Sequence, residues 1–427
     1  MLKTLKIGRK IHHGFKDVLT QRRFFLSDSY RCEEAWKNRL QTPLLQKVQP
    51  TNLFFQLEQV YNSTGKVSPI DVDIFANSIV DEFQIEELLT FIYNLRLTSE
   101  AANILESTHH AVIRLLLHFN HTEDLVTILH DRLNYGIFPD YVCYNVLMDT
   151  YIKKKEYATA AKIAVLPMLQ EDFQHPITNA LSLYSCHKYL ENPDEWQKPE
   201  EKQDDSEEEI KIRVAYIRNP YFDDHFDLTD PKDLVGKTLA LQGKHMNNIL
   251  GRTCQLRGLI LYKKYEDASK LIEGWKDIKE AIVHKEVFDL IKQDNKSIPD
   301  DQVTNEFKNL LSKLDKLKNA NLCDNSLTQD LENNVKSAVQ KQAEKDISEQ
   351  CESYLKWEKI REEELHKHQI ELDRKNRLAK LKEIKKELRH KERLITFFEN
   401  EEKIDLQIEH KQDLEKKTEE RVYPKRI

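Results

Sequence analysis

A short run in the middle of the chain resembles the end of a phosphate-binding loop. Gly236-Lys237-Thr238 offers the lysine and the hydroxyl that such a loop directs at phosphates and their magnesium ion. The loop also needs an earlier glycine, and Pro231 stands at that position. The surrounding residues predict a helix where the loop requires a strand, so the run does not predict a nucleotide site.

Residues that could hold a metal or act as nucleophiles are present but badly spaced. The pairs His12-His13 and His109-His110 have no third ligand at usable spacing. The cysteines form no Cys-x-x-Cys pair, which predicts reduced single thiols and neither a zinc site nor a disulfide framework. We therefore expect no catalytic residue, no metal, no cofactor and no small-molecule substrate. The six cysteines are Cys32, Cys143, Cys186, Cys254, Cys323 and Cys351.

Basic side chains near the predicted helix turns are the residues best suited to bind phosphate. They are Arg114, Arg132 and the run Lys153-Lys154-Lys155. Lysine and arginine neutralise backbone phosphates without reading the base sequence. Solvated turn charges would give the same pattern, so these residues alone leave the role open.

The elements that must position these side chains are predicted to be helices in pairs. Gly136 can adopt the left-handed conformation that ends a helix, and Pro139 prevents its continuation. Asp140 can cap the next helix. Apolar residues at helical spacing follow over residues 144–151, and a second helix is predicted over residues 157–163.

The helix pair recurs along the chain. Units of about 35 residues are predicted near 106–140 and 141–175, and units that bury their faces only against neighbours should occur in arrays. The chain contains only 9 Gly and 12 Pro, too few for the turns of a β-rich fold. We expect an all-α fold: an α-solenoid over residues 27–190, with a degenerate repeat over 233–290.

Residues 1–26 predict a mitochondrial transit peptide. Seven Lys or Arg side chains stand against a single acid, Asp17, and alternate with apolar residues. A basic, acid-poor amphipathic segment is typical of mitochondrial import, and it lacks the apolar run needed for secretion or a membrane span. A basic surface helix is the alternative interpretation. The expected location is the mitochondrial matrix, with no membrane contact.

The charge of the chain restricts how it could bind RNA. Its formal net charge is -7 and its pI is near 6.2, whereas nucleic-acid-binding domains are usually basic. Any RNA contact must therefore be a local patch. Residues 191–232 surround the acidic run 200–209 with prolines, which predicts an acidic flexible insert.

The end of the chain predicts a charged helical tail over residues 331–427, after a linker over 291–330. Residues 331–420 contain no Pro or Gly, and opposite charges recur at helical neighbour spacing. Apolar residues are too sparse for a sustained heptad, so a coiled coil is only weakly indicated. The pattern favours a helix lying along RNA or protein, although a solvated helix would have nearly the same sequence.

Several motifs together resemble one known family. Gly136-Ile137-Phe138-Pro139-Asp140, followed by Tyr144-Asn145-Val146-Leu147-Met148, is similar to a pentatricopeptide repeat. With the leader ending Arg22-Arg23-Phe24-Phe25-Leu26-Ser27 and the charged tail, the chain resembles the mitochondrial small-subunit ribosomal protein twenty-seven family. The resemblance is most specific over residues 130–190. It implies a structural component of the mitochondrial ribosome that binds small-subunit ribosomal RNA and other mitoribosomal proteins.

The resemblance also implies candidate RNA contacts. In pentatricopeptide proteins two or three side chains of each repeat select a base; by the resemblance these are the fifth and last residues. They pair His110 with Asp140, and Asn145 with His175. Neither histidine belongs to the usual pairs, which favours contact with RNA shape or backbone. The residues expected to bind RNA are His110, Arg114, Asn145, Lys153, Lys154 and Lys155.

Two other functions remain open. A free mitochondrial pentatricopeptide factor acting on transcript processing or stability would resemble this chain over the same segment. A protein-only adaptor would use the charged helix to recruit partners. The long charged tail is expected of the ribosomal family, so it favours that function.

Overall fold

The computed structural model describes residues 25–196, 223–275, 280–294, 305–397 and 400–422. Across these residues the chain forms helices and no strand, and the one isolated β-bridge joins His284 and Cys323. The predicted all-α class is confirmed. The chain divides into an N-terminal unit, Met1–Lys359, and a C-terminal unit, Ile360–Ile427. None of the helices in the described ranges has the length and apolarity required to cross a bilayer.

The local signals around residue 140 act as predicted. Gly136 adopts a φ of 63°. The Asp140 side chain caps the next helix by accepting a hydrogen bond from the Cys143 N–H at 2.6 Å. The helices up to residue 189 are α1 (Glu33–Asn38), α2 (Pro50–Thr64), α3 (Pro69–Ser78), α4 (Ile85–Arg96), α5 (Glu106–His118), α6 (Thr122–His130), α7 (Tyr141–Lys154), α8 (Tyr157–Ala164), α9 (Leu166–Leu169) and α10 (Pro176–Tyr189), with short 3-10 helices at Asp28–Arg31, Arg39–Gln41, Leu45–Lys47, Glu82–Gln84 and Ala101–Asn103.

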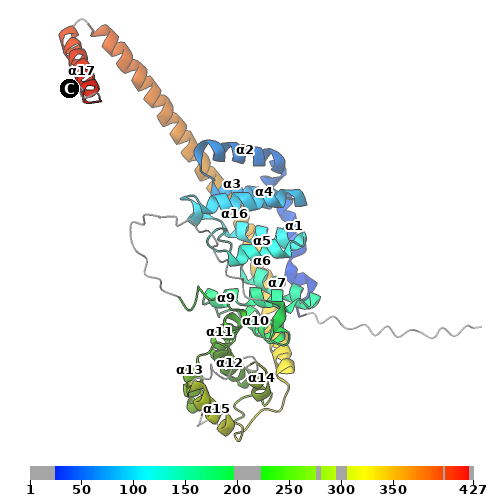
Figure 1. Ribbon diagram of the computed structural model, residues 1–427. Coiled ribbons are helices and arrows are strands. Elements are labelled where there is room, and N and C mark those ends of the chain that lie inside the picture. The colour runs from blue at the N-terminus through cyan, green and yellow to red at the C-terminus, as the bar shows by residue number, and fades with distance from the viewer. Residues whose placement is uncertain (1–24, 197–222, 276–279, 295–304, 398–399, 423–427) are drawn as a thin grey trace, which may run out of the picture. The chain divides into compact units, whose positions relative to one another are not determined.

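Helices α3 to α10 pack as successive pairs (Figure 1). The helices α3, α5, α7 and α10 contact one another in that order, and α8 packs against α6, α7 and α10. Phe75, Leu116, Leu147 and Leu181 are fully buried between them, because each pair covers the apolar face of the next. The assignment of individual pentatricopeptide-like units to 106–140 and 141–175 stays a prediction.

A second group of helices follows in the same unit: α11 (Pro231–Lys244), α12 (Ile249–Leu261), α13 (Tyr265–Gly274), α14 (Val287–Asp294) and α15 (Asn305–Leu317). The helices α12 to α15 enclose their own hydrophobic cluster. Helix α15 lies within the predicted linker over 291–330, whose bounds stay a prediction. Phe307, Leu310 and Leu314 recur at helical spacing and are buried, so α15 is part of the core.

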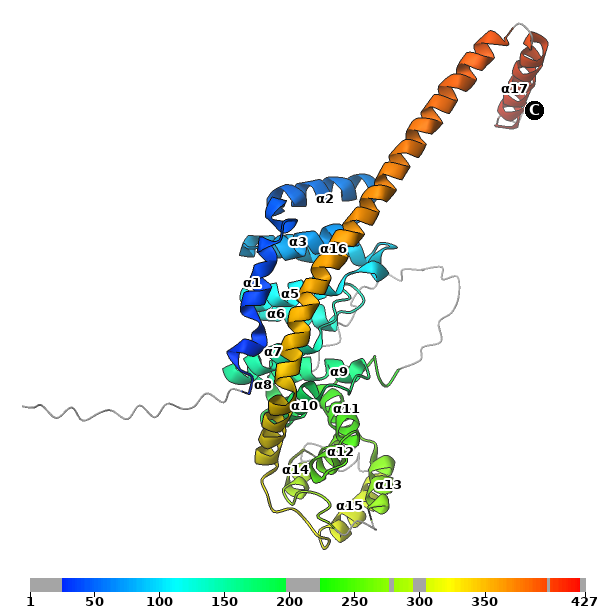
Figure 2. The same ribbon diagram turned by 180° about the vertical axis from the view of Figure 1, so that it is seen from behind.

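The predicted charged tail is largely helical, but its first part is not solvated. Helix α16 spans Leu327–Ile395 and α17 spans Glu401–Val422. Within the N-terminal unit, α16 buries Leu327, Leu331, Val335 and Trp357. Up to residue 359 it lies alongside α10, α7 and α5 (Figure 2). The tail is therefore an integral element of the helix stack up to residue 359.

Two predicted segments fall mostly outside the described residues: 1–24 of the transit peptide and 197–222 of the acidic insert. The last two leader residues are described. Phe25 and Leu26 are buried, and both of their N–H groups donate to the Asp149 carboxylate at 3.3 and 3.4 Å. Asp149 and the core therefore hold the two described residues of the predicted transit peptide.

Candidate functional site

The residues expected to read RNA lie on one face of the helix stack, and α16 covers that face. His110 is on α5, Asn145 is on α7, and His175 precedes α10. All three side chains are buried. Each is linked to α16 directly or through one intervening side chain.

His110 bridges two helices through both ring nitrogens. Nδ1 lies 2.6 Å from Oδ2 of Asp140, and Nε2 lies 2.9 Å from the Tyr354 hydroxyl of α16. The rings of Trp36 and Trp357 lie 5.4 and 5.1 Å from the imidazole. Burial acts to raise the pKa of Asp140, but the neighbouring His110 outweighs it and holds that pKa below its ordinary value. The imidazole has no nitrogen left for a base.

Asn145 belongs to a buried network that ends on α16. It donates to the Tyr30 hydroxyl at 2.7 Å and accepts from Thr178 at 2.8 Å. Tyr30 donates to Asp346 of α16 at 2.6 Å, and His175 lies 3.1 Å from the same carboxylate. Burial acts to raise the pKa of Asp346, but the bonds from His175 and Tyr30 hold it below its ordinary value.

The two arginine candidates also make internal contacts. Arg114 is 5% exposed, donates to the Arg31 carbonyl at 2.7 Å and pairs with Glu33 at 3.1 Å. Arg132 lies over the Phe226 ring, 4.3 Å from its centroid. Arg114 therefore fastens the N-terminal segment to α5 and does not offer its charge to a phosphate.

The three lysines at the end of α7 differ among themselves. Lys153 pairs with the buried carboxylate of Asp149 at 2.6 Å. Lys154 and Lys155 are exposed; the Nζ of Lys154 lies 3.4 Å from Oδ1 of Asn120. Only these last two of the six expected RNA contacts present an exposed charge.

The expected RNA contacts of His110, Arg114 and Asn145 stay a prediction, which their burial does not favour. Base reading requires a polar group that a nucleotide can reach, and these groups are hydrogen-bonded inside the protein. A cavity of about 570 Å³ remains beside α16, near the starts of α7 and α10, and its charged lining includes Glu106, Asp140, Asp346, Glu349 and Lys345. An acidic lining of this kind repels phosphate.

Sequence reasoning predicted this helix but not that its first part covers this face. A signal was available, because Leu327, Leu331 and Val335 recur at helical spacing on α16, as do Tyr354 and Trp357, and all pack against the core. The surrounding charges obscured it. The tail also contains a basic segment that the prediction did not single out.

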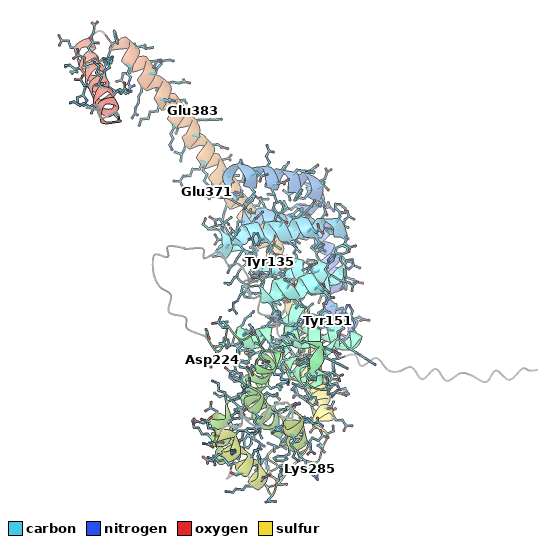
Figure 3. All side chains as sticks on the ribbon, viewed as in Figure 1. Tyr135, Tyr151, Asp224, Lys285, Glu371 and Glu383 are labelled. Carbon is cyan, nitrogen blue, oxygen red and sulfur yellow. The ribbon has the colours of Figure 1, made fainter. Side chains whose placement is uncertain are left out.

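This basic segment, residues 374–393 of α16, lies in the C-terminal unit. All its side chains are exposed, and Figure 3 shows side chains projecting from this part of the helix, where Glu371 and Glu383 are labelled. It carries ten basic side chains against three acidic ones, a formal charge of +7. The basic residues are Arg374, Lys375, Arg377, Lys380, Lys382, Lys385, Lys386, Arg389, Lys391 and Arg393, and the acids are Glu383, Glu387 and Glu392.

These features define a class of protein: an all-α stack of helix pairs that packs against the first part of its own helix α16, whose later part is an exposed basic segment. Residues 1–389 match the family described as mitochondrial 28S ribosomal protein S27. The chain belongs to this family. It is accordingly a mitochondrial ribosomal protein of the small subunit, located in the mitochondrial matrix and engaged in mitochondrial translation.

Proposed function

We propose that this chain is a structural, RNA-associated and non-enzymatic component of the small subunit, which contacts ribosomal RNA through the basic segment 374–393 of α16. Family membership supports the ribosomal setting and makes ribosomal RNA and other ribosomal proteins its expected partners. The observation that carries the RNA contact is the exposed charge of +7 within a chain whose net charge is -7.

The length and spacing of this segment suit a phosphate backbone. Twenty helical residues span about 30 Å, and basic residues are distributed along the whole segment. Such a surface binds by releasing counterions from RNA and is largely indifferent to base sequence. We therefore expect shape-directed binding to structured RNA, and the exposed Lys154 and Lys155 supply a smaller second candidate contact.

The same geometry disfavours a free factor that selects transcripts. Base selection would require His110 to break its hydrogen bond with Tyr354 of α16, and Asn145 to break its hydrogen bond with Tyr30. Breaking such hydrogen bonds costs about 0.5–1.5 kcal/mol each, and an RNA contact in that place would also meet the acidic cavity lining.

A sucrose gradient of mitochondrial lysate at low and high salt tests the proposal. The wild-type chain should co-migrate with the small subunit at both salt concentrations. A variant with Lys380, Lys382 and Lys385 changed to Glu should leave the particle at lower salt, because three charges are reversed in the contact. Co-migration of this variant at every salt concentration would contradict the proposal that the basic segment makes the RNA contact.

A matched variant controls for the loss of charge alone. Lys263, Lys270 and Lys292 are 61%, 71% and 64% exposed on the N-terminal unit, and changing them to Glu should leave co-migration unaltered. In a binding assay with a structured small-subunit RNA fragment, the logarithm of affinity should fall with the logarithm of salt by about 0.9 per phosphate contact. The α16 variant should lose about two to three of these contacts. Equal slopes for the two variants would contradict the assignment.

A further inference from the structure

Three residues with metal-binding side chains meet near the start of α16. His284 precedes α14, Cys323 lies between α15 and α16, and Asp330 is in the first turn of α16. One ligand atom from each lies within 4.8 Å of the other two. Lys285, labelled in Figure 3, is the chain neighbour of this histidine. The cluster is remote in sequence from the basic segment and independent of the proposed RNA contact.

The backbone holds the histidine and the cysteine together. The Cys323 N–H donates to the Val283 carbonyl at 3.0 Å, and the Lys285 N–H donates to the Cys323 carbonyl at 2.9 Å. These bonds form the isolated β-bridge between His284 and Cys323. Two ligands on different segments are thus positioned without help from an ion, which lowers the ordering cost of binding one.

The hydrogen bonds of Thr253 fix the tautomer of His284. The Thr253 hydroxyl donates to the Ile249 carbonyl at 2.8 Å, so its oxygen accepts from both the backbone N–H and Nδ1 of His284, each at 3.0 Å. Nδ1 therefore carries a proton. A metal-binding histidine typically has its second nitrogen held by such a partner.

The other ring nitrogen then faces a carboxylate with a lone pair. Nε2 of His284 lies 2.9 Å from Oδ2 of Asp330. A ring nitrogen and a carboxylate oxygen at this distance share either a proton or a metal ion. The Cys323 thiol completes a nitrogen, oxygen and sulfur set, and such a set suits zinc among the common divalent ions.

We propose that His284, Cys323 and Asp330 bind a Zn²⁺ ion through Nε2, Sγ and a carboxylate oxygen, with water as the fourth ligand. His284 is 1% exposed and Asp330 is 29% exposed, so the ion would reach the site from the side of the carboxylate. On binding, the Cys323 thiol releases its proton to solvent. The ion joins the first turn of α16 to the segments that flank α14 and α15.

A second cluster of metal-binding side chains in the same unit is less suited to a metal ion. His110, Asp140 and Cys143 also bring three ligand types together. There Nε2 of the histidine is directed to Tyr354, and the aspartate caps α7. Burial raises the pKa of the Cys143 thiol well above its ordinary value, which opposes the thiolate a metal requires.

The direct test is metal binding by the purified full chain, with zinc or cobalt chloride as the only added ligand. We expect about one zinc per chain after gel filtration, and a thiolate-to-cobalt charge-transfer band after Co²⁺ substitution. Loss of an orienting partner typically weakens a metal site about 10–100-fold. Thr253→Val should fall in that range, and Cys323→Ser should exceed about 100-fold and abolish the band.

The control is Cys351→Ser, which removes a different partly buried cysteine, one that lies on α16. It should leave the bound zinc and the cobalt charge-transfer band unchanged. If the Cys323 variant fails to fold, the cobalt spectrum of the wild-type chain and zinc protection of Cys323 from alkylation still test whether this thiol binds the metal ion. A wild-type chain with no retained zinc and no thiolate band would overturn the proposal, leaving His284 hydrogen-bonded to Asp330. Unchanged binding by Cys323→Ser would overturn it as well.

Discussion

Asp346 is the carboxylate through which α16 is fastened to the helix stack, and its replacement by alanine should detach that part of the helix. The side chain is 4% exposed and accepts hydrogen bonds from Tyr30 at 2.6 Å, Gln342 at 2.9 Å and His175 at 3.2 Å. Two of these donors belong to other segments. Asp346→Ala leaves both of them buried without their acceptor.

The expected cost follows from these contacts. Each buried donor that loses a hydrogen bond to a charged acceptor costs about 1.5–3 kcal/mol. Tyr30 and His175 both lose Asp346, and the Tyr30 hydroxyl keeps its contact with Asn145, which places the expected value near the lower end of their sum, about 3 kcal/mol. At 1.4 kcal/mol for each factor of ten, this corresponds to roughly a 100-fold larger equilibrium constant for opening of the docked part of α16.

Amide hydrogen exchange measures this opening directly, because locally released helices exchange without global unfolding. Exchange should accelerate over residues 327–359 and much less over α11 and α12. Glu349→Ala provides the matched control: this carboxylate lies one turn away on α16 and is 60% exposed, so its loss should change stability by less than about 0.5 kcal/mol.

The reasoning would be refuted if Asp346→Ala remained folded and exchanged over residues 327–359 at the wild-type rate. If the alanine variant does not fold, Asp346→Asn keeps the shape and removes the charge. It should then show the same pattern with a smaller increase. Equal effects of Asp346→Ala and Glu349→Ala would likewise show that the buried network does not hold the helix.

Gly258→Ala should lower the free energy of unfolding by about 1–3 kcal/mol, because its new Cβ would meet the backbone of Ala240; thermal unfolding measures this loss. The control Gly274→Ala, with no atom within 4 Å of the new Cβ, should be neutral or stabilising. The folded-state pKa values of Asp140 and Asp346 are depressed, so their stabilisation is present above the unfolded pKa near 4 and is lost as pH falls through the folded values. Acid titration followed by circular dichroism should show this loss, and a double Asp→Asn variant should show a shallower slope; an unchanged acid transition would contradict it.

Much of the local structure could be read from the sequence. Asp140 and Gly136 acted within a few residues of their own positions, since a cap or a left-handed turn depends on nearby backbone. The helix pair α7 and α8 followed from apolar spacing alone. The all-α class followed from composition and helical periodicity, and the family resemblance from motifs over a short segment.

The placement of the buried polar residues needed the tertiary structure. His110, Asn145 and Arg114 looked like surface contacts because polar residues are usually exposed. Their partners Tyr354, Tyr30 and Arg31 are 244, 115 and 83 positions away in the chain. No periodicity within a helix encodes such pairings.

The sequence by itself therefore determined which segments are helical, which faces are apolar and where charge accumulates, because these properties depend on neighbours along the chain. Only the tertiary structure decided that the first part of α16 packs on the helix stack while its basic segment stays exposed. It also brought His284, Cys323 and Asp330 together from three segments. The physical reason is the same in each case: burial and ligand geometry are set by contacts between distant residues, and those contacts exist only after the helices pack.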